Sequence, residues 1–387
     1  MRFVLSCQCA VLALLAIRLG WAEIYAQADT PESLKRAVAL EHAGNAAHLE
    51  RLAEFASAGG DAHRERALLR QAAWASPRQV SVWIARGLAA ERAGDFEEAE
   101  SALTQAARLD GQYLPAWTLT NYYYRRQNRE RFWRWARAAA EMTYDDFRPL
   151  FRLCDALEPD AAAVADRLGD GRSMLRAHVT YLAGEGRRLA AAEVSAWRLI
   201  RWRNPEDRPV LANLITREIA ANRAEPALAL WNAAFPALDP ERGQVLGNGN
   251  LDREPSAEGF DWRLRSCAGA SSAWRPGRLR FALQGTQPDA CVLLEQPIPV
   301  RKGKRYVLRF DCRLEAAAGG ESSGLHWVLG PADIPVACAG SSQPSGSAAF
   351  RAEEDGVVPF QFLFRRAAGS VAFEGTAELR NLRMEVR

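Results

Sequence analysis

The chain has 387 residues, of which 48% are hydrophobic and 25% charged, and its formal net charge is +3. This is the composition of a globular protein that is long enough for two domains with separate cores. The small net charge, with acidic and basic residues interspersed, argues against a nucleic-acid partner.

Residues 1–28 have the features of an export segment. Phe3 to Ile17 is an uncharged, mostly apolar run that suits the hydrophobic region of a signal peptide, and Ala26-Gln27-Ala28 offers small residues for cleavage. If Arg18 snorkels, the run instead extends far enough for an N-terminal membrane anchor of about 20 residues. The sequence leaves both interpretations open, beside a buried globular helix. Either export interpretation places the protein in the periplasm, or anchored in the inner membrane and facing the periplasm, with no other membrane contact.

Residues 30–237 have the periodicity of paired helices. Trp83 and Trp117 lie 34 residues apart, and each begins a pattern of one bulky and several small residues that is typical of two crossing helices. The pattern predicts full hairpins and looser or partial ones, in the following ranges: 32–40, 45–77, 78–111, 112–142, 174–200 and 210–235.

These residues resemble tetratricopeptide repeats, most closely over residues 45–142. The resemblance implies a solenoid whose first helices line a concave groove that holds a protein partner. The third copy departs from the pattern, because Trp133 stands where a small residue is usual and Arg137 where an apolar one is expected.

Repeat positions carried over from Trp83 and Trp117 predict the residues of the groove. Tyr122, Arg125 and Arg126 form the expected anchor, an aromatic ring with two donors for carboxylates or an extended peptide. Alternatively, the two arginines only complement the C-terminal end of a helix. The complete predicted groove is Leu88, Glu91, Arg92, Thr118, Tyr122, Arg125 and Arg126.

Residues 245–387 differ from the preceding region in composition and pattern: glycine and serine are more frequent, and apolar residues alternate with polar ones. The alternation predicts about eight short strands in an antiparallel sandwich. Its clearest segments are Leu279–Leu283, Tyr306–Leu314, Val358–Phe364 and Leu379–Val386. The fold class expected for the whole chain is therefore multidomain, an all-α solenoid followed by an all-β sandwich.

Several segments of this second region resemble the jelly-roll sandwiches of carbohydrate-binding modules and galactose-binding-like domains. They are Asn248-Gly249-Asn250-Leu251, Gly259-Phe260-Asp261-Trp262, Gln296 to Val300 and Ala377 to Leu382. The resemblance implies a glycan site on exposed aromatic rings, for which Trp262, Trp274 and Trp327 are the candidates. Trp274 stands in a predicted loop, whereas alternation would equally place Trp262 and Trp327 in the core.

Four cysteines, Cys267, Cys291, Cys312 and Cys338, fall in the last third of the chain. They allow up to two disulfides without fixing the connectivity, and each is equally acceptable as a small buried apolar residue.

No motif for metal, nucleotide or nucleophilic chemistry is found, so we expect no cofactor, no metal and no enzymatic activity. Helical repeats joined to such a sandwich also resemble envelope proteins associated with bacterial polysaccharide production. The sequence thus predicts a non-enzymatic scaffold of the bacterial cell envelope, whose groove binds an envelope protein, with a role in polysaccharide biosynthesis or export. The alternatives are a carbohydrate-binding protein that acts through its sandwich, and an enzyme with an unrecognised site.

Overall fold

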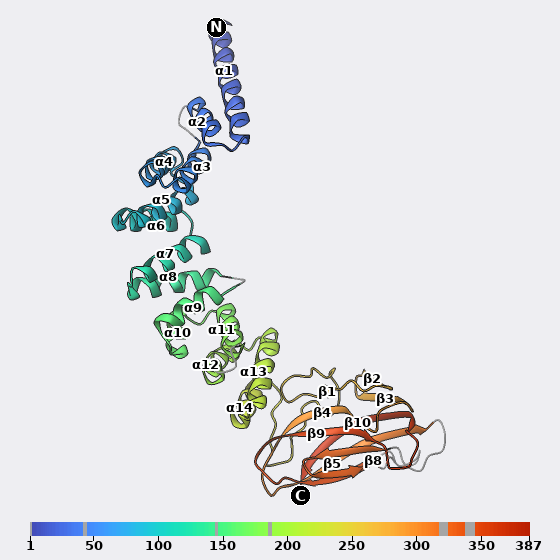
Figure 1. The fold of residues 1–387 in the computed structure, drawn as a ribbon. Helices are drawn as coiled ribbons and strands as arrows, with labels where there is room; N and C mark the ends of the chain where they lie inside the picture. Colours follow the sequence, from blue (N-terminus) through green and yellow to red (C-terminus); the bar gives the residue numbers. More distant parts are fainter. Residues whose placement is uncertain (1, 42–44, 144–145, 185–187, 317–323, 337–344) are drawn as a thin grey trace. The chain divides into compact units, whose positions relative to one another are not determined.

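The computed structural model describes residues 2–41, 45–143, 146–184, 188–316, 324–336 and 345–387 (Figure 1). The chain forms two compact units, one of residues 1–157 and 167–171 and one of residues 158–166 and 172–387. The predicted fold class is confirmed, since helical hairpins precede two antiparallel sheets.

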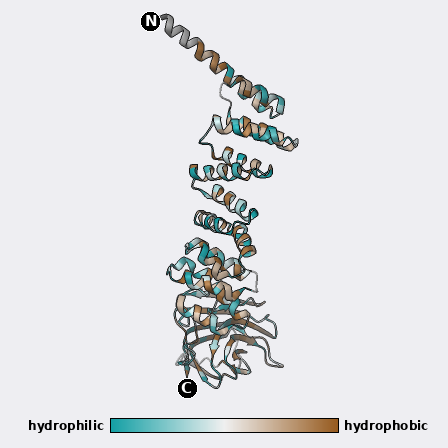
Figure 2. Cartoon of the chain, turned by 90° about the vertical axis from the view of Figure 1, so that its left-hand side faces the viewer, coloured by the Kyte–Doolittle hydropathy of each residue, from teal (hydrophilic) through white to brown (hydrophobic). Residues whose placement is uncertain are grey.

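The first unit begins with one long helix and continues with short paired helices. α1 (Arg2–Gln27) carries exposed apolar side chains from Val11 onward, and Figure 2 shows a hydrophobic stretch followed by a mixed one. None of the helices within the described residues is long and apolar enough to span a bilayer. The helices that follow are α2 (Pro31–Leu40), α3 (Ala46–Ala58), α4 (Ala62–Ala75), α5 (Val80–Arg92), α6 (Phe96–Leu109), α7 (Tyr113–Arg125), α8 (Arg129–Met142) and α9 (Arg148–Leu157).

Each of the three regular hairpins has the same turn chemistry. The residue before the second helix, Asp61, Asp95 or Asn128, accepts a hydrogen bond through its side chain from the third backbone N–H of that helix. Gly60 and Gly94 precede two of these caps at φ 78°, a conformation that glycine adopts without strain. The caps and turns fix where each second helix starts.

The remaining helices lead into the sandwich. α10 (Ala161–Leu168) is divided between the two units, and the second unit continues with four helices and a short 3₁₀ turn. These are α11 (Arg172–Gly184), α12 (Leu189–Ile200), η1 (Pro205–Asp207), α13 (Arg208–Ala220) and α14 (Ala224–Ala234). The sequence had predicted the last two helical pairs, but not α9 and α10.

Ten described strands form two antiparallel sheets. One sheet has the order β1-β4-β9-β6-β7 and the other β2-β3-β10-β5-β8. The strands are β1 (Arg263–Leu264), β2 (Ala270–Arg275), β3 (Arg278–Gln284), β4 (Ala290–Val300), β5 (Arg305–Ala316), β6 (Leu325–Leu329), β7 (Ala332–Pro335), β8 (Ser345–Arg351), β9 (Gly356–Arg365) and β10 (Glu374–Val386). From β4 onward the chain alternates between the sheets, with the β6–β7 hairpin as one step, which is a jelly-roll connectivity.

Aromatic side chains fill the space between the sheets. Trp327 lies at the centre, with its ring centroid 4.8 Å from those of Phe360 and Phe362. A disulfide joins Cys267 to Cys291. Cys312 is buried on β5, and Cys338 lies outside the described residues.

Candidate functional site

The first helices of the hairpins form one continuous face. α3 contacts α5 and α5 contacts α7, so the first helices of the hairpins line one side of the array, which we call the inner face. This inner face is where tetratricopeptide-type repeats offer a concave surface.

The caps correct the alignment of the third hairpin. Asp61 and Asp95 are 34 positions apart, but Asn128 follows Asp95 after 33, because the connection before α7 is three residues long and the one before α5 four. Trp83 is therefore the fourth residue of α5, whereas Trp117 is the fifth of α7. The two tryptophans do not occupy equivalent positions, and the predicted one-to-one match is wrong.

The corrected alignment also removes one of the two departures noted in the third copy, the one at Arg137. The equivalents of Ala99 and Leu103 are Phe132 and Ala136 rather than Trp133 and Arg137. Both Phe132 and Ala136 are fully buried. Ala136 is apolar as the repeat pattern requires, whereas Phe132 still places a large ring where a small residue is usual.

Three predicted groove residues leave the inner face for the same reason. Tyr122 is only 2% exposed, and its hydroxyl donates to the carbonyl oxygen of Phe96 at 3.0 Å. Thr118 is buried and donates to the carbonyl oxygen of Leu114. Arg126 stacks on the Phe96 ring, 3.6 Å from its centroid. Tyr122 and Arg126 thus pack the third hairpin against Phe96 of the second, and the predicted anchor is wrong.

The corrected positions are occupied by side chains that sequence reasoning missed. Trp117, Asn121 and Tyr124 of α7 take the places that Ile84, Leu88 and Glu91 take on α5, and all six are partly exposed. Of the predicted set, Leu88, Glu91, Arg92 and Arg125 lie on the first helices α5 and α7 and are partly or fully exposed. The signal that could have found the others is the shortened connection before α7.

A pocket opens on the inner face between α3 and α5, with a volume of about 400 Å³. Ala53, Leu69, Ala85 and Leu88 provide its apolar part. Its polar lining is mostly acidic, with Glu50, Glu54, Glu65, Ser57 and Arg92.

The carboxylates of the pocket differ in their partners. Glu65 pairs with Arg92 at 2.5 Å, and the exposed Glu54 contacts Arg51. Glu50 accepts hydrogen bonds from Gln79 at 2.7 Å and Ser81 at 3.1 Å, but no described cation pairs with it. Burial raises the pKa of Glu50 above its usual value, which is the response of a carboxylate without a countercharge. The pocket is thus suited to a cation with an apolar stem.

Arg125, by contrast, is already neutralised. Its guanidinium makes two hydrogen bonds of 2.7 Å to the carboxylate of Glu91, one from Nε and one from an Nη atom. This fork geometry satisfies both partners. A carboxylate ligand would have to displace Glu91, which does not favour the predicted capture of carboxylates by Arg125.

Further ion pairs hold the hairpins in register. Glu98 of α6 accepts from Arg66, Arg70 and Arg86, at 2.5, 2.8 and 3.0 Å. These hydrogen bonds, that from Arg70 above all, hold the pKa of Glu98 well below its usual range. The inner face is therefore carried by helices that are tied together through charge.

The sandwich does not present the predicted aromatic site. Trp262 and Trp327 are 0% and 1% exposed and belong to the core, so neither ring can stack on a sugar. Trp274 lies on the edge strand β2, not in a loop, and is half-buried with its indole N–H donating to the carbonyl oxygen of Leu251 at 2.9 Å.

The outer face of the β1-β4-β9-β6-β7 sheet carries polar side chains instead. Across neighbouring strands, Arg263 pairs with Glu295 and Glu295 with Gln361. Gln361 donates to Glu295 at 2.9 Å, and Arg265 lies 3.4 Å from the same carboxylate. Burial lowers the pKa of Arg263. Among the residues that the structure describes, no group of three or more His, Cys, Asp or Glu side chains is placed to hold a metal ion.

Helices of 13 and 14 residues that pair in successive hairpins, with capped turns 33 or 34 residues apart, define a tetratricopeptide-type repeat array. The helical region thus has this repeat architecture, and a jelly-roll sandwich follows it in the chain.

No protein-family model and no curated protein matches the chain. Among solved structures it is similar to YrrB, "a TPR protein with an unusual peptide-binding site", with 14% identity and a TM-score of 0.28 over 53% of this chain and 92% of that one. It is similar to PilW, a "type IV pilus biogenesis factor", with 14% identity and a TM-score of 0.23 over 49% and 76%. It is also similar to a structure titled "CBM4 structure and function", with 12% identity and a TM-score of 0.27 over 37% and 99%. The assignment of the fold rests on the helices and strands themselves.

Proposed function

We propose that this protein is a non-enzymatic adaptor that holds an extended segment of a partner protein on the inner face of its helical repeats. The observation that carries the proposal is the pocket between α3 and α5, which combines an apolar wall around Leu88 with the carboxylates of Glu50 and Glu54. Such a pocket is suited to binding and orienting a side chain.

The charge of the pocket defines the partner segment. Glu50 and Glu54 favour a lysine or arginine, whose aliphatic stem would lie along Ala85 and Leu88. Trp117 and Tyr124, one hairpin further along the same face, would contact the apolar residues of the segment. The expected ligand is thus an extended peptide with a basic residue next to apolar ones.

We place this adaptor outside the cytoplasm, either free in the periplasm or anchored in the inner membrane by its N-terminal segment. The Cys267–Cys291 disulfide supports this location, because such bonds persist in oxidising compartments. The partner would be an envelope protein. A role in polysaccharide biosynthesis or export rests only on the similarity of domain arrangement.

A peptide library displayed on phage tests the groove. The full chain should enrich peptides with a basic residue beside apolar ones, and E50Q/E54Q should weaken their binding about tenfold or more, because two carboxylates are lost. The matched control is E97Q/E130Q, which removes two exposed carboxylates from the second helices. Equal binding by both double variants would refute the groove assignment.

A second candidate function is glycan binding on the outer face of the β1-β4-β9-β6-β7 sheet. The observation in its favour is the polar row of Arg263, Glu295 and Gln361, which crosses three strands, with Arg265 beside Glu295 just after β1. Titrating the full chain with envelope polysaccharides and repeating the titration with R265Q/Q361A would test it. Binding that the double variant leaves unchanged would remove this face from consideration.

A further inference from the structure

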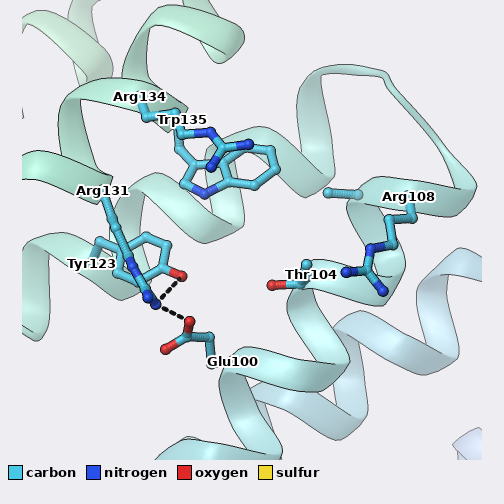
Figure 3. Close-up of a pocket in the computed structure, with 8 residues that line it drawn as sticks. Glu100, Thr104, Arg108, Tyr123, Arg131, Arg134 and Trp135 are labelled. Atoms are coloured by element: carbon cyan, nitrogen blue, oxygen red, sulfur yellow. Dashed lines mark hydrogen bonds and ion pairs between the residues drawn. The ribbon is translucent and has the colours of Figure 1, made fainter.

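A second pocket lies between the second helices α6 and α8, on a different surface from the inner face. Its volume is about 330 Å³ (Figure 3). Thr104 and Arg108 line it from α6, and Arg134 and Trp135 line it from α8. It is large enough for a side chain or a short stretch of peptide.

These four residues present hydrogen-bond donors that no described protein group accepts. Neither Arg108 nor Arg134 makes an ion pair with a described carboxylate, whereas many other arginines of the repeats do. The hydroxyl of Thr104 and the indole N–H of Trp135 likewise have no acceptor among the described residues. The pocket therefore gathers donors, and what it lacks is an acceptor.

The remaining wall of the pocket is internally satisfied. Arg131 contacts the carboxylate of Glu100 and donates to the hydroxyl of Tyr123 at 3.3 Å, and Figure 3 shows these three side chains together. Glu100 is the only carboxylate in the described lining, and Arg131 neutralises it. Three arginines against one glutamate leave two positive charges in the pocket.

Each aromatic ring of the lining has an arginine guanidinium over one of its faces. The guanidinium of Arg134 lies over the Trp135 ring, 5.7 Å from its centroid, and that of Arg131 lies 5.6 Å from the centroid of Tyr123. Stacking of this kind holds a guanidinium in one orientation and leaves its N–H groups available. The arrangement favours a planar oxyanion over the face of a sugar.

We propose that the pocket formed by Thr104, Arg108, Arg134 and Trp135 binds a carboxylate of an acidic segment in a protein partner. Arg108 and Arg134 would clamp the carboxylate from the two helices, while Thr104 and Trp135 donate to its oxygens. This surface is independent of the proposed groove, and its ligand has the opposite charge.

Fluorescence anisotropy of a labelled Glu-rich peptide, with the matched Gln-rich peptide as the blank, tests the site on the full chain. The wild type should bind the Glu-rich peptide with an affinity that falls as salt rises. R108Q/R134Q should weaken binding about tenfold or more, because two charge-assisted contacts are lost. W135F, which keeps a ring but removes the N–H, should weaken it by a smaller factor.

The control R64Q/R78Q removes the same charge from two exposed arginines that make no described ion pair elsewhere in the repeats. An equal loss in both double variants would show general electrostatic attraction and refute the site. Failure of the wild type to bind the Glu-rich peptide would also refute it. If an oligouronate bound more tightly than the Glu-rich peptide, the ligand would be an acidic glycan and not a protein segment, and the proposal would be overturned. E50Q/E54Q should leave binding unchanged, which separates this site from the groove.

Discussion

The helical hairpins and the β-sandwich bury their apolar surface with different side chains. Alanines such as Ala72, Ala99 and Ala139 occupy the buried positions where helices cross, whereas the sandwich encloses Trp262, Trp327 and several phenylalanines between its sheets. Each alanine removes little area from water and lets helices approach closely, while each aromatic ring removes far more.

Charge compensates for the thin apolar core of the hairpins. Arg66–Glu98, Glu65–Arg92 and Glu91–Arg125 each join successive hairpins. Such a repeat array is stabilised between neighbours, and part of that stability depends on pH and salt. The sandwich depends instead on one shared aromatic core and on disulfide bonding that includes the Cys267–Cys291 bond.

The largest difference in stability between the two regions should come from removing the central ring of the sandwich. Trp327→Ala should lower the free energy of unfolding of the sandwich by about 3–5 kcal/mol, because a large cavity replaces stacked rings. Chemical denaturation followed by tryptophan fluorescence measures this loss. Trp74→Ala, at a ring that is 78% exposed, is the control and should change little. If Trp327→Ala lowered the free energy of unfolding by less than Trp74→Ala does, the two sheets would not depend on one common aromatic core.

Removing the disulfide should have the next largest effect. The Cys267–Cys291 bond closes a separation of 24 residues, and C267S/C291S should cost about 3 kcal/mol through the entropy of the unfolded chain. Denaturation of the oxidised wild type against the double variant measures it. If the unfolding of the hairpins shifted as much as that of the sandwich, the two regions would not be stabilised separately.

Low pH should reduce the stability that Glu98 gives to the helical hairpins. Because its pKa is depressed in the folded state, Glu98 stabilises the fold above the unfolded value of about 4.3, and this stability is lost as pH falls through the folded value. Glu98→Gln should therefore destabilise the hairpins by about 1–3 kcal/mol at neutral pH and progressively less at acidic pH. Urea denaturation across this pH range tests it, with E97Q as control. A penalty that does not change with pH would contradict the ion-pair explanation.

Glu218 should show a pH dependence of the opposite sign. It is fully buried on α13 beside Glu193 and Arg223, and burial raises its pKa to about 7. The folded state then holds a proton that the unfolded state loses, so stability should fall by up to about 1.4 kcal/mol per pH unit between about 4.3 and 7. Glu218→Gln should flatten this slope in denaturation series. Parallel slopes for the wild type and the variant would show that Glu218 stays charged.

The repeats were well predicted, because helix periodicity and turn chemistry are local properties. The sequence indicated the three regular hairpins and the last two helical pairs close to their observed bounds. The α9 and α10 helices were missed because they are short and stand outside the regular period. The four clearest strand segments were confirmed as β3, β5, β9 and β10.

The site was harder to predict, because a face depends on single-residue alignment. The alignment relied on two tryptophans 34 residues apart and ignored that the connection before α7 is one residue shorter. Every position predicted on α7 was therefore shifted by one, and the predicted anchor Tyr122 is buried. Alternation in the sandwich predicted strands but could not decide which side of each sheet faces the core. Trp262 and Trp327 were therefore equally acceptable as core or surface residues until the strands were paired.

The contact between α14 and the start of the sandwich has a practical consequence. Trp231 meets Phe260 edge-on at 5.6 Å, and a Cβ at Gly259 would lie 2.6 Å from the Trp231 ring. The backbone N–H of Gly259 donates to Thr216 at 2.6 Å. The change in composition near residue 240 is thus no natural cleavage point, because a fragment cut there would expose the Phe260 ring to water and invite aggregation. Expression of the sandwich by itself should start at α11.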